Sequence, residues 1–200
     1  MSLLRLPDKP IRISQDKLDE MDNGLYIGTF KRDGWRAVLC HTEESEYQVW
    51  SRHNKRLDTL PDFDPAIIDA FKELDTPAGT QIDGEWERRR AGNKEGANRV
   101  AIFGVLRWDK KWLGRAPEEE RWERTLALPL DGSYLFVPEH AEHGFRDLFE
   151  RSKEDWANEG IVLKLKKSRL ILDRRESKKN NGWYKIKWRD GADGQTLTDF

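Results

Sequence analysis

The sequence has almost no cysteine: Cys40 is the single one among 200 residues. One thiol cannot form a disulfide within the chain, and a four-cysteine zinc site is excluded. The sequence also lacks any apolar run near the roughly 20 residues that a membrane-spanning helix needs, and its mean hydropathy is −0.89. Proline interrupts the first ten residues too early for a secretory signal. We therefore expect an intracellular, cytoplasmic protein in a reducing compartment.

Net charge is low as well, at −1, but it is distributed unevenly. Residues 161–189 carry eleven Lys or Arg and two acids, which gives this segment +9 and leaves −10 for the rest. A basic segment on an acidic chain is typical of a surface for phosphates or nucleic acid. A charge run alone is more often a solvated surface, so charge by itself does not decide between the two.

The hydrophobic pattern predicts short strands interspersed with helices. Strands are expected at 25–30, 35–41, 46–51, 79–89, 99–109, 133–138, 159–166 and 181–188, and helices at 64–74, 117–128 and 144–152. Asp64 and Pro65 are suited to begin the first helix. The prediction is one α+β domain over residues 1–200, dominated by antiparallel strands with helices on the flanks, and 190–200 as a flexible tail.

The segment Lys31-Arg32-Asp33-Gly34-Trp35-Arg36 combines a lysine at the end of one apolar strand with a glycine turn and an arginine that opens the next strand. Burial and nearby positive groups lower the pKa of a lysine, which can then act as a nucleophile. Arg36, Lys185 and Lys187 are candidates for those positive groups. Taken alone, this segment is more often a charged hairpin turn, because Asp-Gly is a common turn pair.

Three further segments place charge inside strands. Ile82-Asp83-Gly84-Glu85 holds two acids, Glu159-Gly160-Ile161-Val162-Leu163-Lys164 offers a carboxylate for a divalent metal, and Lys185-Ile186-Lys187 sets two lysines on one strand face. Carboxylates inside a strand are costly unless they are paired or bound, and adjacent ammonium groups favour an anion between them. The ordinary explanations are a solvated face for the acids and edge strands for the other two segments.

In order and spacing, these motifs resemble those of the covalent nucleotidyltransferases: DNA ligases, RNA ligases and mRNA capping enzymes. The resemblance extends over residues 24–189 and includes Ser51-Arg52 and an apolar strand with a central Phe103. The connecting segments 49–63, 103–126 and 159–188 are similar to the adenylation domain of ATP-dependent DNA ligases. The resemblance implies an α+β nucleotidyltransferase fold, the ATP-grasp-like ligase adenylation domain of mainly antiparallel sheets flanked by helices.

The resemblance also implies a mechanism, in which Lys31 attacks the α-phosphate of ATP and keeps AMP on its amine. AMP then passes to a 5′-phosphate at a nick in duplex DNA or RNA. The implied catalytic residues are Lys31, Asp33, Lys185 and Lys187. The implied nucleotide-binding residues are Arg36, Arg52, Glu85, Phe103, Val162 and Lys164. Glu159 and Glu85 would hold Mg²⁺ or Mn²⁺, and Arg52, Arg174, Arg175, Lys178 and Lys179 would contact nucleic acid.

The sequence departs from the family pattern at a few places. Gly104 stands where many ligases have Asp, and Thr29 where DNA ligases often have Glu. Ligases usually continue past the Lys-x-Lys motif into an OB-fold domain, which has no room here, so we expect no OB fold, or one supplied by a partner chain, and a monomer that binds no membrane. An RNA ligase, a capping-type guanylyltransferase and a non-catalytic nucleic-acid-binding relative remain the alternatives.

Overall fold

The computed structural model describes residues 6–7, 9–88, 98–170 and 182–189. Eleven strands and five helical segments lie in these ranges. In chain order they are β1 (Ile11–Arg12), η1 (Gln15–Lys17), α1 (Leu18–Met21), β2 (Tyr26–Arg32), β3 (Trp35–His41), β4 (Tyr47–Ser51), α2 (Ala66–Glu73), β5 (Thr80–Glu87), β6 (Arg99–Trp108), β7 (Lys111–Trp112), α3 (Glu118–Leu126), β8 (Leu135–Phe136), β9 (His140–Ala141), α4 (Phe145–Arg151), β10 (Asn158–Leu165) and β11 (Trp183–Lys187).

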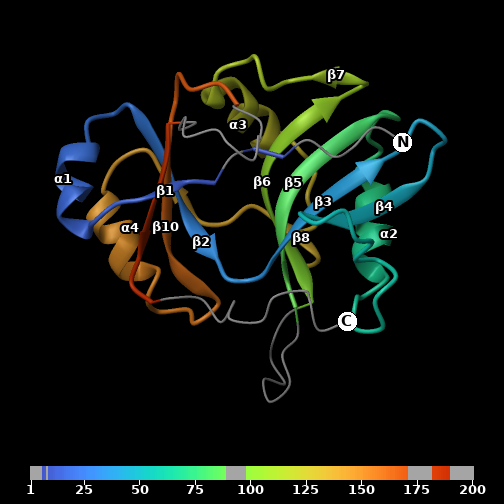
Figure 1. Ribbon diagram of the computed structural model, residues 1–200, viewed down its shortest axis with the longest axis horizontal. Coiled ribbons are helices and arrows are strands. Elements are labelled where there is room, and N and C mark those ends of the chain that lie inside the picture. Colours follow the sequence, from blue (N-terminus) through green and yellow to red (C-terminus); the bar gives the residue numbers. More distant parts are fainter. Residues whose placement is uncertain (1–5, 8, 89–97, 171–181, 190–200) are drawn as a thin grey trace.

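The strands form two sheets (Figure 1). The smaller sheet has the order β1-β11-β10-β2-β9, and the larger has the order β4-β3-β5-β6-β7 with β8 paired to β6. Every pair is antiparallel except β1–β11 and β6–β8. The predicted α+β class with mainly antiparallel sheets is therefore confirmed. No OB fold is present in the described ranges, since all their strands belong to these two sheets.

Helices cover one face of each sheet (Figure 1). Leu18 of α1 and Phe145, Leu148 and Phe149 of α4 pack on the smaller sheet. Ile67, Ala70 and Phe71 of α2 pack on the larger one, and the Asp64 carboxylate accepts the Ala66 N–H at 3.0 Å where that helix begins. Each sheet thus buries one apolar face under helices. The other face of the larger sheet carries a small apolar cluster of Leu6, Val38 and Cys40 as well as polar groups.

Strand alternation decides which residues lie on the second face of each sheet. Phe30, Ile161 and Ile186 belong to the core under α4. Successive side chains of a strand point to opposite faces, so their neighbours Lys31, Val162 and Lys187 lie on the face away from the helix. Those two faces, one from each sheet, carry nearly all the candidate residues.

The turn after Lys31 connects the two sheets instead of forming a hairpin. β2 pairs with β10 and β9, and β3 pairs with β4 and β5, so the hairpin interpretation of this segment is wrong. Gly34 makes the crossing possible, because a Cβ there would lie 2.3 Å from the Trp86 carbonyl oxygen. The pattern of apolar residues predicts the strands but not the partners that they choose.

The other predicted elements are confirmed. All eight predicted strands and all three predicted helices are present, with bounds that differ by a few residues. The hydrophobic pattern does not predict β1, α1, β7 or β9, which are two to four residues long. The predicted tail at 190–200 lies outside the described residues. In the described part of the chain, no helix is long and apolar enough to cross a membrane.

A buried ion cluster joins the sheets behind the Lys31 turn. The Arg32 guanidinium contacts Glu87 of β5 and donates to Asn158 at 2.7 Å and to Asp155 at 3.0 Å. Arg99 of β6 donates to the second Glu87 oxygen at 2.9 Å. Arg32 and Glu87 are both buried, so each charge has lost its hydration. The ion pairs and hydrogen bonds within the cluster compensate for that loss.

We expect the substitution Arg32→Met to destabilise the fold by about 3 kcal/mol or more, because it removes one partner of a buried carboxylate. The measurement is the free energy of unfolding from urea titration. Arg146→Met is the matched control, since Arg146 pairs with Asp19 at the surface, and it should leave the transition unchanged. Equal transitions for both variants would show that the cluster does not hold the sheets together.

Candidate active site

Glu159 lies at the centre of the candidate site. One of its carboxylate oxygens contacts Lys31 Nζ of β2, and the other contacts Lys187 Nζ of β11. The Glu159 side chain is only 5% exposed, and those of the lysines are 20% and 17% exposed. One buried carboxylate therefore holds two ammonium groups from the strands on either side of it.

A bulge in β10 places this carboxylate. Asn158 pairs with Arg32 and Gly160 pairs with Lys31, so Glu159 is an extra residue on its strand. An extra residue breaks the alternation and re-aims a side chain. Gly160 has φ +144°, and a Cβ there would lie 1.9 Å from the Ile186 carbonyl oxygen. The geometry thus explains the Glu-Gly pair of the motif. The bulge redirects the side chain of Glu159, and the missing Cβ of Gly160 lets the backbone of β11 approach closely.

The surroundings of Lys31 favour its neutral form. Burial lowers the pKa of Lys31 to about 8, and the positive charges of Lys187 and Lys185 lower it too, against the opposing effect of Glu85 and Asp33. The sequence predicted this combination of burial and nearby lysines. A neutral amine at the end of a strand is the form that can attack an electrophile.

Asp33 is held by an arginine that the sequence analysis did not single out. Arg189 donates to the Asp33 carboxylate at 3.0 Å and to the Asn158 carbonyl at 3.1 Å, and it also contacts the Trp156 carbonyl. The Asp33 side chain is 1% exposed. Arg189 therefore fixes the orientation of Asp33 two residues from Lys31. Its place two residues after the Lys-x-Lys motif gave no signal of this contact.

The opposite sheet supplies Arg36, Asp83 and Glu85. Arg36 makes a two-pronged contact with Asp83, and it pairs in register with Glu85. Burial raises the pKa of Asp83, and Arg36 opposes that effect. Asp83 is 2% exposed, so the solvated-face explanation for this acid is wrong. Glu85 acts electrostatically on Lys31, which places the two sheets against one another here.

Phe103 lies on β6 of the larger sheet and Val162 on β10 of the smaller one. Both are partly exposed, and neither belongs to an apolar core. Lys164, two residues after Val162, donates to the Phe103 carbonyl oxygen at 2.8 Å, which ties β10 to β6. Lys164 also lies 3.1 Å from Glu118 of α3 and over the Trp183 ring. The contact of Lys164 with the Phe103 carbonyl oxygen thus connects the strands that carry the two predicted residues.

The Lys-x-Lys strand is internal. β11 lies between β1 and β10, and β10 lies between β11 and β2, so the edge-strand explanation is wrong for both motifs. Lys185 pairs with Val162 across the sheet. Burial contributes most to the lowered pKa of Lys185, and the positive charge of nearby Arg52 lowers it further. Arg174, Arg175, Lys178 and Lys179 lie outside the described residues.

The carboxylates provide two ligands for a divalent metal. Glu85 and Glu159 both act on Lys31, one through its charge and one by direct contact. No cluster of three or more His, Cys, Asp or Glu able to hold a metal occurs among the described residues. Two carboxylates fit Mg²⁺, which is usually bound by one or two protein carboxylates together with water and substrate phosphates.

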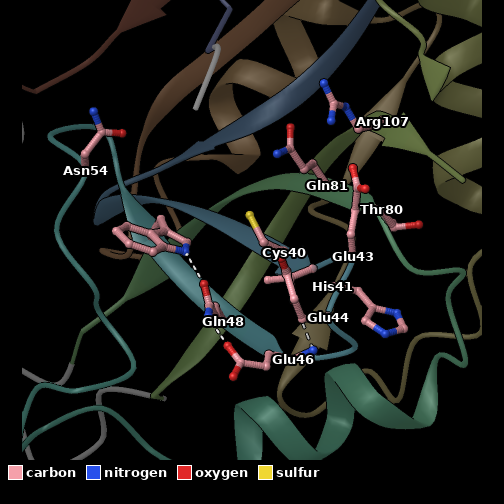
Figure 2. Close-up of a pocket in the computed structure, with 13 residues that line it drawn as sticks. Cys40, His41, Glu43, Glu44, Glu46, Gln48, Asn54, Thr80, Gln81 and Arg107 are labelled. Atoms are coloured by element: carbon pink, nitrogen blue, oxygen red, sulfur yellow. Dashed lines mark hydrogen bonds between the residues drawn. The ribbon is translucent and has the colours of Figure 1, made fainter. Parts of the chain in front are cut away.

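A cavity of about 670 Å³ lies elsewhere, at the far end of the larger sheet (Figure 2). Cys40 is four residues from Arg36 along β3, or about 13 Å. Figure 2 shows Gln48 linking Glu46 and the Trp50 indole. Burial raises the pKa of the Cys40 thiol to about 12, which keeps it from acting as a nucleophile. The reactive groups therefore gather at Lys31 and not in this cavity.

Comparison with known proteins identifies this fold. No family model and no curated protein sequence matches the chain. Among solved structures, 90% of the chain aligns with a mycobacterial DNA ligase D complexed with ATP, at 18% identity and a TM-score of 0.64. The ATP-dependent DNA ligase of bacteriophage T7, in complex with ATP, aligns over 90% of the chain at 19% identity and a TM-score of 0.55.

An archaeal ATP-dependent RNA ligase also aligns over 90% of the chain, at 15% identity and a TM-score of 0.55. The chain spans 60% of the mycobacterial structure, 68% of the phage structure and 47% of the archaeal one. It therefore has the fold of the nucleotidyltransferase domain found in ATP-dependent ligases, as the motifs predicted. Identities this low show the fold and leave the substrate open.

The lowered pKa of Lys31 can be tested without any substrate. We expect reaction of Lys31 with acetic anhydride to increase with a midpoint near pH 8, because half of the amine is neutral at its pKa. The increase should level off about two pH units above that pKa, where almost all of the amine is neutral. Lys17 is the internal control, since its hydrogen bond to Glu20 raises its pKa and its reactivity should still increase at pH 10. The measurement is competitive acetylation followed by peptide mass spectrometry. A Lys31 profile parallel to that of Lys17 would contradict the assignment.

Proposed function

We propose that residues 1–200 form the adenylation domain of an ATP-dependent polynucleotide ligase that acts on nicked duplex DNA. Lys31 takes AMP from ATP, AMP passes to the 5′-phosphate at the nick, and the 3′-hydroxyl displaces it. The observation that carries the proposal is Lys31 itself: a buried amine with a pKa of about 8, beside Glu159 and Lys187. The nucleotidyltransferase fold supports it.

In the first step the neutral Lys31 amine attacks the α-phosphorus. The new bond joins Nζ to phosphorus, the bond from phosphorus to the bridging oxygen breaks, and pyrophosphate leaves with that electron pair. Nζ releases one proton to water as the nitrogen–phosphorus bond forms. At pH 8 about half of the molecules carry the amine in its neutral form. Lys185 and Lys187 stabilise the charge that develops on the phosphoryl oxygens. Lys31 must separate from Glu159 before this attack. Lys187, the other partner of Glu159, would then bind the incoming phosphate.

The nucleoside would lie between Phe103 and Val162. Phe103 stacks on one face of the base and Val162 covers the other, with Arg36 and Glu85 at the ribose. When bound to Glu159 and Glu85, Mg²⁺ or Mn²⁺ would neutralise charge on the phosphates. Arg36 is already oriented by Asp83, so the protein loses little side-chain freedom on binding.

Nucleic acid would bind through phosphate contacts from Arg52 and from the basic segment 161–189, with Arg174, Arg175, Lys178 and Lys179 among its cations. Electrostatic binding of this kind weakens steeply with salt. An RNA ligase is the second candidate, favoured by the similarity to an archaeal RNA ligase. A capping-type guanylyltransferase differs from the DNA and RNA ligases because it would use GTP. A non-catalytic relative would react with neither ATP nor GTP. We propose that the domain works as a monomer.

Lys31→Arg should abolish covalent labelling by α-³²P-ATP, because a guanidinium keeps the charge but does not provide a neutral amine. Labelled peptide mapping should locate AMP at Lys31 in the wild-type chain. Lys153→Arg, at an exposed lysine on the outer side of the smaller sheet, is the matched control and should be labelled normally. Labelling by GTP in preference to ATP would favour the capping enzyme, and no label from either nucleotide would favour the non-catalytic relative.

Glu159→Gln and Glu85→Gln should each slow labelling about a hundred- to a thousandfold, the usual effect of losing one charged contact to a transition state. Added Mn²⁺ should partly restore the rate if these carboxylates bind a metal. The measurement is the single-turnover labelling rate at saturating ATP. Glu44→Gln, at the distal cavity, is the control. Rates equal to the control in both variants would remove the two carboxylates from the mechanism.

A further inference from the structure

The N-terminal strand β1 extends the smaller sheet beyond the Lys-x-Lys strand. Arg12 pairs with Lys185, and the Ile13 N–H donates to the Lys185 carbonyl at 3.0 Å. Ile13 packs into the core under α4. Because side chains alternate, Arg12 lies on the opposite face, with Lys185 and Val162. A cross-strand row therefore runs Arg12–Lys185–Val162–Thr29 along the open face of the sheet.

This row extends away from the strand of the nucleophile. Lys31 is on β2, the lysines of the motif are two strands away on β11, and Arg12 is one strand farther on β1. Adjacent strands lie about 4.8 Å apart, so Arg12 is attached about 14 Å from the strand of the nucleophile. In-line attack at phosphorus expels pyrophosphate on the side opposite the attacking amine.

The electrostatics of Lys185 reveal a concentration of positive charge at this place. After burial, the charged groups that lower its pKa most are Lys187, Lys9, Arg12 and Arg52, all of them cations. Lys9 and Arg12 are exposed, and they come from a segment that no sequence motif singled out. Cations gathered on one face attract a compact anion of high charge.

We propose that Arg12 of the N-terminal strand and Lys9, two residues before that strand, form with Lys185 a binding subsite for pyrophosphate, the β- and γ-phosphates of the incoming nucleotide. This inference rests on the proposed function for the source of its ligand. A phosphate of nucleic acid has the same chemistry as pyrophosphate. We favour pyrophosphate because Arg12 shares its row with Lys185 and Val162, the residues assigned to the nucleotide. Lys9 and Arg12 are positioned to hold the leaving group, and they take no part in forming the bond to Lys31.

The test compares the variants Lys9→Gln, Arg12→Gln and their combination with wild type. The double variant Lys72→Gln with Lys153→Gln removes the same charge from exposed pairs on α2 and beyond α4, and serves as the control. Binding of inorganic pyrophosphate is measured by calorimetry, which does not require catalysis. The KM for ATP in AMP labelling and the affinity for nicked duplex DNA are measured beside it. Arg12→Lys retains the charge and should bind like wild type.

In the Lys9→Gln, Arg12→Gln variant we expect the Kd for pyrophosphate to increase roughly five- to tenfold, the effect of losing two exposed charged contacts. The KM for ATP should increase alike, and the control should match wild type. Unchanged pyrophosphate affinity overturns the inference, as does a wild-type chain that binds no pyrophosphate. A loss confined to nicked DNA also overturns it and assigns the cations to nucleic acid.

Failure of this inference is distinguishable from failure of the proposed function. If wild type takes no AMP label but the variant loses pyrophosphate affinity, the subsite is upheld and the ligase proposal is overturned. If labelling is normal and pyrophosphate affinity does not change, the ligase proposal is upheld and the subsite is overturned. Thermal unfolding of each variant confirms that the exposed substitutions leave the fold intact.

Discussion

The contact of Glu159 with Lys31 and Lys187 is the interaction on which the rest of the site depends. A carboxylate this deeply buried is costly unless it is paired, and each lysine has the same requirement. The pairing needs β10 between β2 and β11, a bulge that re-aims Glu159, and a glycine beside it that lets the Ile186 carbonyl approach. Sheet order, backbone irregularity and residue choice therefore follow from one charge requirement.

The two sheets meet through charged groups on their facing sides. Arg32 and Glu87 join them behind the Lys31 turn, Lys164 joins β10 to β6, and Glu85 acts on Lys31 across the gap. Ionic contacts of this kind can exchange partners when a ligand brings its own charge, which an apolar interface cannot do. Under the proposed function, a phosphate that enters would replace the carboxylate as the partner of the lysines. The groups that hold the interface together here would then be the ones that bind the ligand.

Much of the fold could be predicted from sequence because local patterns decide it. Alternating apolar residues mark the strands, and Asp64 marks the start of α2. Strand partners could not be predicted, since β2 and β3 are adjacent in sequence yet lie in different sheets. The motifs located Lys31, Glu159 and Lys187, but Arg189 on Asp33 and Arg12 beside Lys185 depend on long-range pairing that spacing does not encode. The charge run at 161–189 indicated phosphates without showing which cations face the site.

Under the proposed function, the lysines of β11 have two tasks, and a bound phosphate opposes the first of them. Their positive charge helps to lower the pKa of Lys31, and the same charge has to attract phosphate. A bound triphosphate brings several negative charges close to Lys31, and these would raise its pKa and return it to the ammonium form. Further cations beside the phosphates offset that effect, because their positive charges cancel part of the negative charge that acts on the amine. Arg52, Arg12 and Lys9, gathered around Lys185, supply such charge without occupying the position from which Lys31 attacks. Under the proposed function, the excess of cations on this face therefore limits the rise in the pKa of Lys31 that an anionic substrate would cause.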